Sequence, residues 1–195
     1  MKRTMDFKER PTVEQLESEL ARERYRTRYG STLRSTVYIL ITVAAVAVLV
    51  ATLWLPVLQI YGSSMTPTLN DKEVVLSLKG GSFETGDVIA FYYNNRILVK
   101  RVIADSGQWV DIKDDGTVYV DGEAIDEPYV SEKSLGECDL EFPYQVPESR
   151  LFVLGDHRSV SLDSRTTAIG CVAEEQIVGR IVYRVWPLGS LGAVK

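Results

Sequence analysis

Hydrophobic positions divide the chain into one long unbroken run and a later series of short runs. No charged residue occurs between Ser35 and Asn70, and Thr36 to Leu55 are almost all apolar. As a helix, these 20 residues rise by about 30 Å, the thickness of a bilayer's hydrocarbon core. The pattern therefore predicts a transmembrane helix over residues 36–56, between an N-terminal segment, 1–35, and a larger domain, 57–195.

After Pro56 the apolar positions fall in short runs rich in Val, Ile and Tyr, separated by Gly, Asn and Asp. Runs of this length and composition predict strands joined by turns, and hence a mainly β, antiparallel domain. The two asparagines of "YNNR" predict a tight hairpin. The expected strands are "EVVLSL", "DVIAFYY", "RILVKRVIA", "WVDIK", "TVYVDG", "LFVLG" and "IVGRIVYRVW".

Two segments do not show this alternation. Thr12 to Tyr29 is expected to form a short helix, because Thr12 and Gln15 have capping-box spacing and Gly30 can end it. Residues 126–149 contain three prolines and no clear period, so a long surface loop is expected there. The loop either shapes a substrate groove or is without function, and its pattern favours neither.

Charge is unevenly spread along the chain and indicates its orientation. Residues 1–35 carry nine Lys/Arg against six Asp/Glu, whereas the rest carries 13 against 21. By the positive-inside rule, the basic side faces the cytoplasm and the catalytic domain is extracytoplasmic, on a single-pass plasma-membrane protein. The alternatives are a cleaved signal peptide, which the long preceding segment disfavours, and a buried soluble helix. The arginines before the apolar run are Arg22, Arg24, Arg26, Arg28 and Arg34.

Composition bears on nucleic-acid binding, metal binding and disulfide formation. The acidic larger part lacks the basic face that nucleic-acid binding requires. His157 is the only histidine and no CxxC motif occurs, so no metal site and no cofactor is predicted. Cys138 and Cys171 would both face an oxidising exterior, which permits a disulfide without requiring one.

Candidate chemistry begins at "YGSSMTPTL", just beyond the apolar run, where Ser63 and Ser64 are both possible nucleophiles. A serine hydroxyl is weak until a neighbouring base takes its proton. One candidate base is His157, within the polar stretch "GDHRS", and the other is a lysine whose pKa burial lowers. The residues alone do not choose between the two serines.

Lys100 is the lysine best placed to be such a base. In "RILVKRVIA" a period of two puts Lys100 on the same face of the strand as Leu98 and Val102, and this face is otherwise apolar. The alternative is a lysine that protects an edge strand against aggregation. Lys72, Lys79, Lys113 and Lys133 lie among polar or turn residues instead.

Three motifs in order carry a resemblance to a known family. With "SSMTPTL", "LVKRVIA" and "LGDHRSVSLDSR" behind the apolar run, residues 59–187 resemble bacterial type I signal peptidases of peptidase family S26. The resemblance implies a signal-peptidase/LexA-like antiparallel β-sheet domain behind one N-terminal transmembrane helix. It also implies a serine endopeptidase that cleaves signal peptides from exported preproteins, after small residues at −1 and −3.

The resemblance assigns roles to individual residues. Ser64, immediately before Met65, falls on the nucleophile, Lys100 on the general base, and Ser161 on the serine that hydrogen-bonds the lysine. The charged supporting positions are Asp163, Arg165, Asp156 and Arg158. The positions expected near substrate and membrane are Ile60, Tyr61, Met65 and Pro67.

Two residues depart from the family pattern. His157 replaces the usual Asn, and we expect it to be a polar scaffold residue. Gly62 stands where some members have a serine whose hydroxyl helps the oxyanion hole. Members with glycine at this position resemble Gram-positive enzymes. The hole is then expected to rely on backbone N–H groups, including that of Ser64.

The implied partners are the signal peptides of secretory preproteins, the lipid bilayer and, by proximity, the Sec/Tat export machinery. Three other functions use part of the same pattern. They are a self-cleaving repressor-type protease, a dedicated peptidase for one pilin or conjugation substrate, and a non-enzymatic anchored binding module. The membrane anchor disfavours the repressor-type protease. The lysine on an apolar strand face disfavours the non-enzymatic binding module.

Overall fold

The structure is a computed structural model that describes residues 12–194, without the side chains of residues 26–28. Residues 1–11 of the predicted basic segment, the side chains of Arg26 and Arg28, and Lys195 at the end of the predicted domain lie outside the described part. The chain divides into two units, Met1–Val50 and Ala51–Lys195, and each is described by itself.

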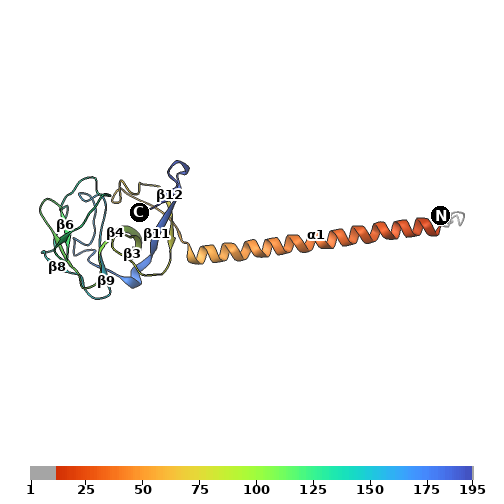
Figure 1. Cartoon of the computed structure of the whole chain (residues 1–195), viewed down its shortest axis with the longest axis horizontal. Helices are drawn as coiled ribbons and strands as arrows, with labels where there is room; N and C mark the ends of the chain where they lie inside the picture. The colour runs from red at the N-terminus through yellow and green to blue at the C-terminus, as the bar shows by residue number, and fades with distance from the viewer. Residues whose placement is uncertain (1–11, 195) are drawn as a thin grey trace, which may run out of the picture. The chain divides into compact units, whose positions relative to one another are not determined.

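One long helix, α1 (Val13–Trp54), dominates the first unit (Figure 1). Its most apolar stretch has a mean hydropathy of 2.5 and no buried residue, so α1 is long and apolar enough to cross a membrane. The Thr12 N–H donates to Gln15 Oε1 at 3.1 Å, as the predicted capping pair requires. By length and composition α1 is therefore compatible with a membrane anchor.

The prediction of a separate short helix ending at Gly30 is wrong, because α1 continues through this residue. Glycine inside a helix costs only about 1 kcal/mol relative to alanine, and no proline follows until Pro56. Helical geometry is disfavoured for the residue before a proline, and α1 ends at Trp54. The predicted boundary between residues 35 and 36 therefore has no counterpart in the backbone.

The second unit is built mainly from an antiparallel sheet of eight strands (Figure 1). Its order is β1-β2-β11-β3-β4-β9-β10, and β12 pairs with β11. The strands are β1 (Val57–Gln59), β2 (Val74–Leu78), β3 (Val88–Tyr93), β4 (Arg96–Ala104), β9 (Arg150–Leu154), β10 (Val172–Ala173), β11 (Ile177–Trp186) and β12 (Gly192–Ala193).

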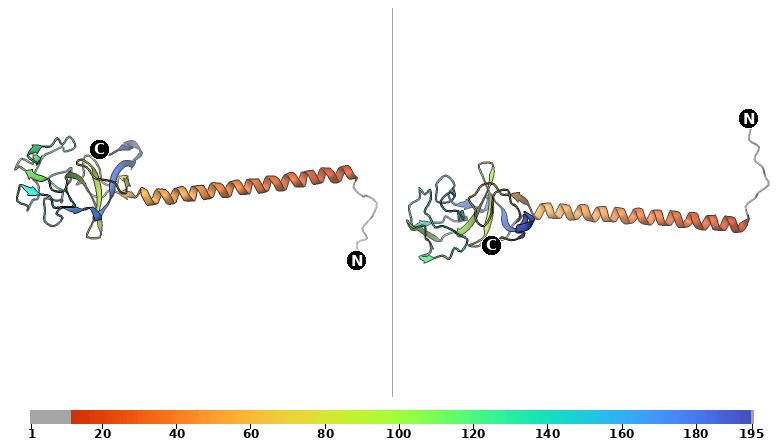
Figure 2. Two further views of the ribbon diagram at one scale, coloured as in Figure 1. Left: turned by 60° about the horizontal axis from the view of Figure 1, so that its bottom comes forward. Right: turned by 90° about the horizontal axis from the view of Figure 1, so that it is seen from above.

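A second, four-stranded antiparallel sheet has the order β7-β6-β5-β8. Both views of Figure 2 show it at the end of the β domain opposite to the β11–β12 hairpin. Its strands are β5 (Trp109–Ile112), β6 (Val118–Val120), β7 (Glu123–Ala124) and β8 (Tyr144–Gln145). Two short 3-10 helices, η1 (Glu174–Gln176) and η2 (Leu188–Ser190), flank β11 in the chain.

The mainly β, antiparallel fold is confirmed, and each predicted strand is present. Asn94 and Asn95 have φ angles of 43° and 62° and join β3 to β4, so the predicted hairpin is confirmed too. Both residues adopt positive φ, as a type I′ turn requires. The strands that the sequence did not reveal, such as β1 and β8, are two or three residues long and too short to show alternation.

The loop over residues 126–149 is more than the surface excursion that its composition predicts. Leu135, Leu140 and Phe142 pack against the core cluster that contains Val110 and Phe152, beneath the second sheet. The loop also supplies β8 and a buried carboxylate, at Glu127. The prolines interrupt the periodicity of apolar residues in the loop, but apolar residues that face the core are still present. The sequence pattern therefore did not reveal that these residues are buried.

Candidate active site

The two adjacent serines lie in a turn that follows β1. Gly62 has a φ of 89°, a conformation that side chains rarely adopt, and its N–H donates to Asp71 Oδ1 at 2.9 Å. The Ser63 carbonyl accepts from both the Thr66 N–H at 3.2 Å and the Thr66 hydroxyl at 2.8 Å. Ser63 is exposed and Ser64 half-buried, so the turn directs the second serine toward the domain.

Lys100 lies in the middle of β4 and is only 3% exposed. Its Nζ is 2.7 Å from Ser64 Oγ. Burial removes water from the amine and lowers its pKa to about 8. Asp163 raises the pKa, Arg165 lowers it and Asp156 raises it, so the net shift is set by desolvation. The structure thus brings together a hydroxyl and an amine that is neutral in part near neutral pH.

The segment after β9, residues 155–165, packs directly against the serine turn. The His157 backbone N–H donates to the Ser64 carbonyl at 3.0 Å. A Cβ at Gly155 would lie 2.6 Å from the same carbonyl and would also meet the Ser161 side chain. Only glycine therefore allows this segment to approach the backbone of Ser64 so closely.

Buried ion pairs fix this segment. Asp163 and Arg165 are both 0% exposed, and their side chains meet at 2.8 Å (Nε–Oδ1) and 2.9 Å (Nη2–Oδ2). Asp163 Oδ2 also accepts from the Gly155 N–H at 3.0 Å, and Arg165 Nη1 donates to the Leu135 carbonyl at 2.5 Å. Because the two buried charges of Asp163 and Arg165 are paired and hydrogen-bonded, this pair holds the shape of the segment.

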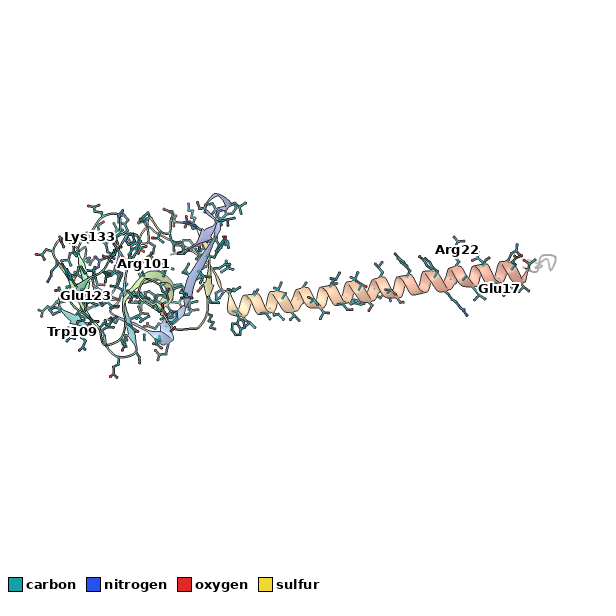
Figure 3. The ribbon with its side chains drawn as sticks, viewed as in Figure 1. Glu17, Arg22, Arg101, Trp109, Glu123 and Lys133 are labelled. Carbon is teal, nitrogen blue, oxygen red and sulfur yellow. The ribbon has the colours of Figure 1, made fainter. Side chains whose placement is uncertain are left out.

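A second buried pair lies beside the lysine. Arg101, the next residue after Lys100, binds the Asp156 carboxylate through Nε at 2.9 Å and Nη2 at 2.7 Å. The Tyr129 ring covers the Arg101 guanidinium at 3.8 Å from the ring centroid. Figure 3 shows Arg101 in the interior of the β domain, whereas Trp109, Glu123 and Lys133 lie at its periphery.

Three residues of this network escaped the sequence analysis. Glu127 forms a buried ion pair with Arg158 and also accepts from the Tyr129 hydroxyl at 3.2 Å. Burial and the neighbouring Glu127 raise the Tyr129 pKa. Arg101 could have been found, because a second charge in the apolar run "LVKRVIA" requires a buried partner. Glu127 and Tyr129 carry no such signal in the loop that contains them.

Ser161 does not make the contact expected of it. Its Oγ is buried and forms no hydrogen bond with any residue in the described range 12–194, Lys100 included. The side chain lies against Gly155 instead, and the Ser161 carbonyl accepts from Arg165 Nη2 at 3.2 Å. The predicted hydrogen bond between Ser161 and Lys100 is therefore not formed in the described part of the chain.

His157 is half-buried, and its ring bonds to a threonine. Nδ1 lies 2.9 Å from Thr66 Oγ1. Among the described residues, the ring has no hydrogen bond to Ser64, so the geometry favours Lys100 over His157 as the base. In the same described range Cys138 is half-buried, Cys171 is buried and both are unpaired, which resolves the open question of the disulfide.

A groove of about 770 Å³ leads to the serine and the lysine. It lies between β1 with the turn that follows it and the first half of β4. Ile60 and Met65 are 4% and 2% exposed and belong to the core, whereas Tyr61 is 78% exposed. Pro67 is exposed and is not among the lining residues. Those are Val57, Leu58, Gln59, Ile60, Tyr61, Gly62, Ser64, Met65, Asn95, Arg96, Ile97, Leu98, Val99 and Lys100.

Comparison with known proteins places this arrangement in context. A family model described as signal peptidase, peptidase S26, matches residues 33–186. Signal peptidase IB of Staphylococcus aureus is 39% identical over 152 residues, which cover 67% of this chain and 78% of that protein. Signal peptidase I U of Bacillus subtilis is 34% identical over 148 residues, covering 70% and 78%.

Among solved structures, a signal peptidase I from Enterococcus faecalis V583 is similar to this chain. The sequence identity is 29% and the TM-score is 0.42. The match covers 51% of this chain and 97% of that chain.

Proposed function

The chain belongs to the signal peptidase family, peptidase S26, and we propose that it removes signal peptides from exported preproteins with Ser64 as nucleophile and Lys100 as general base. One observation carries this proposal: the 2.7 Å contact between Lys100 Nζ and Ser64 Oγ, made by an amine whose pKa lies near 8. A nucleophile and a base within hydrogen-bonding distance are the signature of an acyl-transfer site.

In the first half of the reaction, neutral Lys100 accepts the Ser64 proton while Oγ attacks the scissile carbonyl. The tetrahedral intermediate collapses as the lysine ammonium gives this proton to the leaving amine. The mature protein then departs and the signal peptide remains as an ester of Ser64. In the second half, Lys100 takes a proton from water, the hydroxide attacks the ester, and the proton returns to Ser64.

The oxyanion of each tetrahedral intermediate needs a donor. Gly62 has no side chain to offer one, so we assign this role to the Ser64 backbone N–H. Asp71 supports the assignment, because its carboxylate holds the Gly62 N–H at 2.9 Å and so fixes the start of the turn.

The preprotein is bound as an extended strand in the groove between β1 and β4. β1 is the edge of the larger sheet, where backbone groups are open to a further strand. The apolar lining next to Ser64, which includes Ile60, Met65 and Val99, suits small apolar side chains at −1 and −3. Tyr61 and Pro67 remain proposed contacts with substrate or membrane.

Membrane anchoring by the apolar helix is the second part of the proposal. We assign residues 36–56, which include the last part of α1, to the bilayer, residues 1–35 to the cytoplasm and residues 57–195 to the outside, because the arginines precede the span. A preprotein that emerges from the export machinery then meets Ser64 close to the outer membrane surface. Family membership favours this role over a repressor-type protease or a binding module, and a dedicated peptidase remains the second candidate.

Processing of a model preprotein by full-length variants tests the proposal. Ser64→Ala and Lys100→Ala should each lower the cleavage rate by about 10³-fold or more. Ser63→Ala is the matched control, since it removes the neighbouring hydroxyl and keeps the backbone contacts. Native activity in Ser64→Ala would refute the assignment of the nucleophile, and sequencing the product's new N-terminus would reveal whether cleavage follows small residues.

A further inference from the structure

The contacts of His157 lead to the peptide unit that carries the oxyanion donor. Its Nδ1 lies 2.9 Å from Thr66 Oγ1, and the same Oγ1 lies 2.8 Å from the Ser63 carbonyl oxygen. Its backbone N–H donates to the Ser64 carbonyl at 3.0 Å. Residue 157 thus contacts the nucleophile turn through both its backbone and its ring.

A count of hydrogens determines which atom donates. A threonine hydroxyl has one hydrogen and two lone pairs, and the Ser63 carbonyl can only accept. If the Thr66 hydrogen points to that carbonyl, the hydroxyl can only accept from His157, so Nδ1 must carry a proton. A bare Nδ1 would take the Thr66 hydrogen for itself and leave the carbonyl without the hydroxyl bond. Both contacts are satisfied only when residue 157 is a donor.

The direction of the Ser63 carbonyl matters because the peptide bond is planar and trans. The Ser63 C=O and the Ser64 N–H belong to the same unit and point in opposite directions, so fixing one fixes the other. We propose that His157 is a positioning residue which, by donating from Nδ1 to Thr66, orients the Ser64 N–H toward the oxyanion. This inference rests on the proposed function and extends it.

Two local features make this bond important. Gly62 brings no side-chain donor, so the oxyanion depends on the Ser64 N–H. Within the described chain, the only other hydrogen bond to the Ser63 carbonyl comes from the Thr66 N–H, at a longer 3.2 Å. An asparagine places its Nδ2 two bonds beyond Cβ, as histidine places Nδ1, so the Asn of the family pattern would offer the same donor.

The test compares two pairs of full-length variants in detergent, measuring kcat, KM, the pH profile and the thermal midpoint with a preprotein substrate. Thr66→Val is nearly isosteric but has no hydroxyl, whereas Thr66→Ser keeps it. His157→Ala removes the donor, whereas His157→Asn restores it. We expect Thr66→Val and His157→Ala to lower kcat by about 10- to 100-fold, because a misdirected oxyanion donor acts on the transition state.

The control pair and the other readouts separate positioning from a general structural role. Thr66→Ser and His157→Asn should recover most of kcat, and KM, the pH midpoint and the thermal midpoint should stay near native in all four variants. Native kcat in both Thr66→Val and His157→Ala overturns the proposal. So does a His157→Asn variant as slow as His157→Ala, which would mean that the imidazole itself is required.

Two further outcomes are distinguishable. If His157→Ala does not fold, the threonine pair decides alone, since neither change alters charge or size substantially. If Thr66→Val is fully active while Ser64→Ala is inactive, the positioning role fails and the proposed peptidase function stands. An active Ser64→Ala would instead remove the proposed function on which this inference depends.

Discussion

Lys100 Nζ lies 2.7 Å from Ser64 Oγ although the lysine is only 3% exposed. A buried ammonium loses its hydration, and its neutral form is favoured at a lower pH than in water. With a pKa of about 8, roughly one tenth of the free enzyme carries the neutral amine at pH 7. The structure therefore predicts how activity depends on pH.

Cleavage should become faster as pH rises through about 8, by about tenfold between pH 7 and the plateau. The reason is that protonated Lys100 has no lone pair with which to accept the Ser64 proton. The measurement is kcat/KM for a preprotein or peptide from pH 5.5 to 10. A rise centred near pH 6.5 would point to histidine as the base and contradict the assignment.

Replacing Lys100 by methionine should stabilise the protein while abolishing cleavage. The pKa of Lys100 is lower in the folded state than in the unfolded state, so protonation of the lysine destabilises the fold. This destabilisation is present in full below pH 8 and vanishes above pH 10.5. From 10.5 to about 8 this cost is about 3 kcal/mol, an upper limit for the gain at pH 7. Unfolding of both proteins at pH 7 and 10.5 checks it, and equal stability at pH 7 would show that burial costs nothing.

Gly155→Ala should lower activity strongly. The added Cβ would lie 2.6 Å from the Ser64 carbonyl and closer still to Ser161 Oγ, so the serine turn or the segment after β9 must shift and the Ser64–Lys100 contact is disturbed. A displacement of about 1 Å can cost about 100-fold in rate. Gly189→Ala is the matched control, because an alanine there meets no atom within 4 Å. Cleavage assays on both variants are decisive, and equal rates would place the segment after β9 farther from the nucleophile.

Glu127→Ala should destabilise the β domain by about 3–5 kcal/mol, because it leaves the buried Arg158 guanidinium without its partner. Glu132→Ala, in the same loop but exposed, should change stability by less than about 0.5 kcal/mol. Denaturant unfolding of the two variants measures the contrast. If Glu127→Ala changed the stability as little as the control does, the loop over residues 126–149 would have no structural role and the prediction would be wrong.

Reducing agent should leave the thermal midpoint unchanged, since Cys138 and Cys171 are free in the described chain. Burial raises the pKa of the Cys171 thiol and keeps it from reagents. In a thiol titration of the native protein, Cys138 should react first and Cys171 only on unfolding. A single disulfide found by mass spectrometry of the non-reduced protein would contradict this.

The sequence by itself determined the features that depend on neighbouring residues. The uncharged stretch through Thr36–Leu55 is apolar enough for a membrane helix whatever the rest of the chain does. Alternation revealed the longer strands, and two asparagines at positions 94 and 95 specified the hairpin. The same alternation showed that Lys100 lies on an otherwise apolar face of its strand, where an ammonium is unfavourable. The motif order was enough to recognise the family.

Only the tertiary structure decided which groups meet. The Lys100–Ser64 and His157–Thr66 contacts join residues 36 and 91 positions apart, and no local period carries that information. The Glu127–Arg158 pair likewise depends on how a proline-rich loop packs, and the hydrogen bond expected between Ser161 and Lys100 is not formed among the described residues. Local pattern sets which residues are buried, whereas three-dimensional packing sets which buried polar groups become partners, because each must find a donor or acceptor wherever the chain brings one.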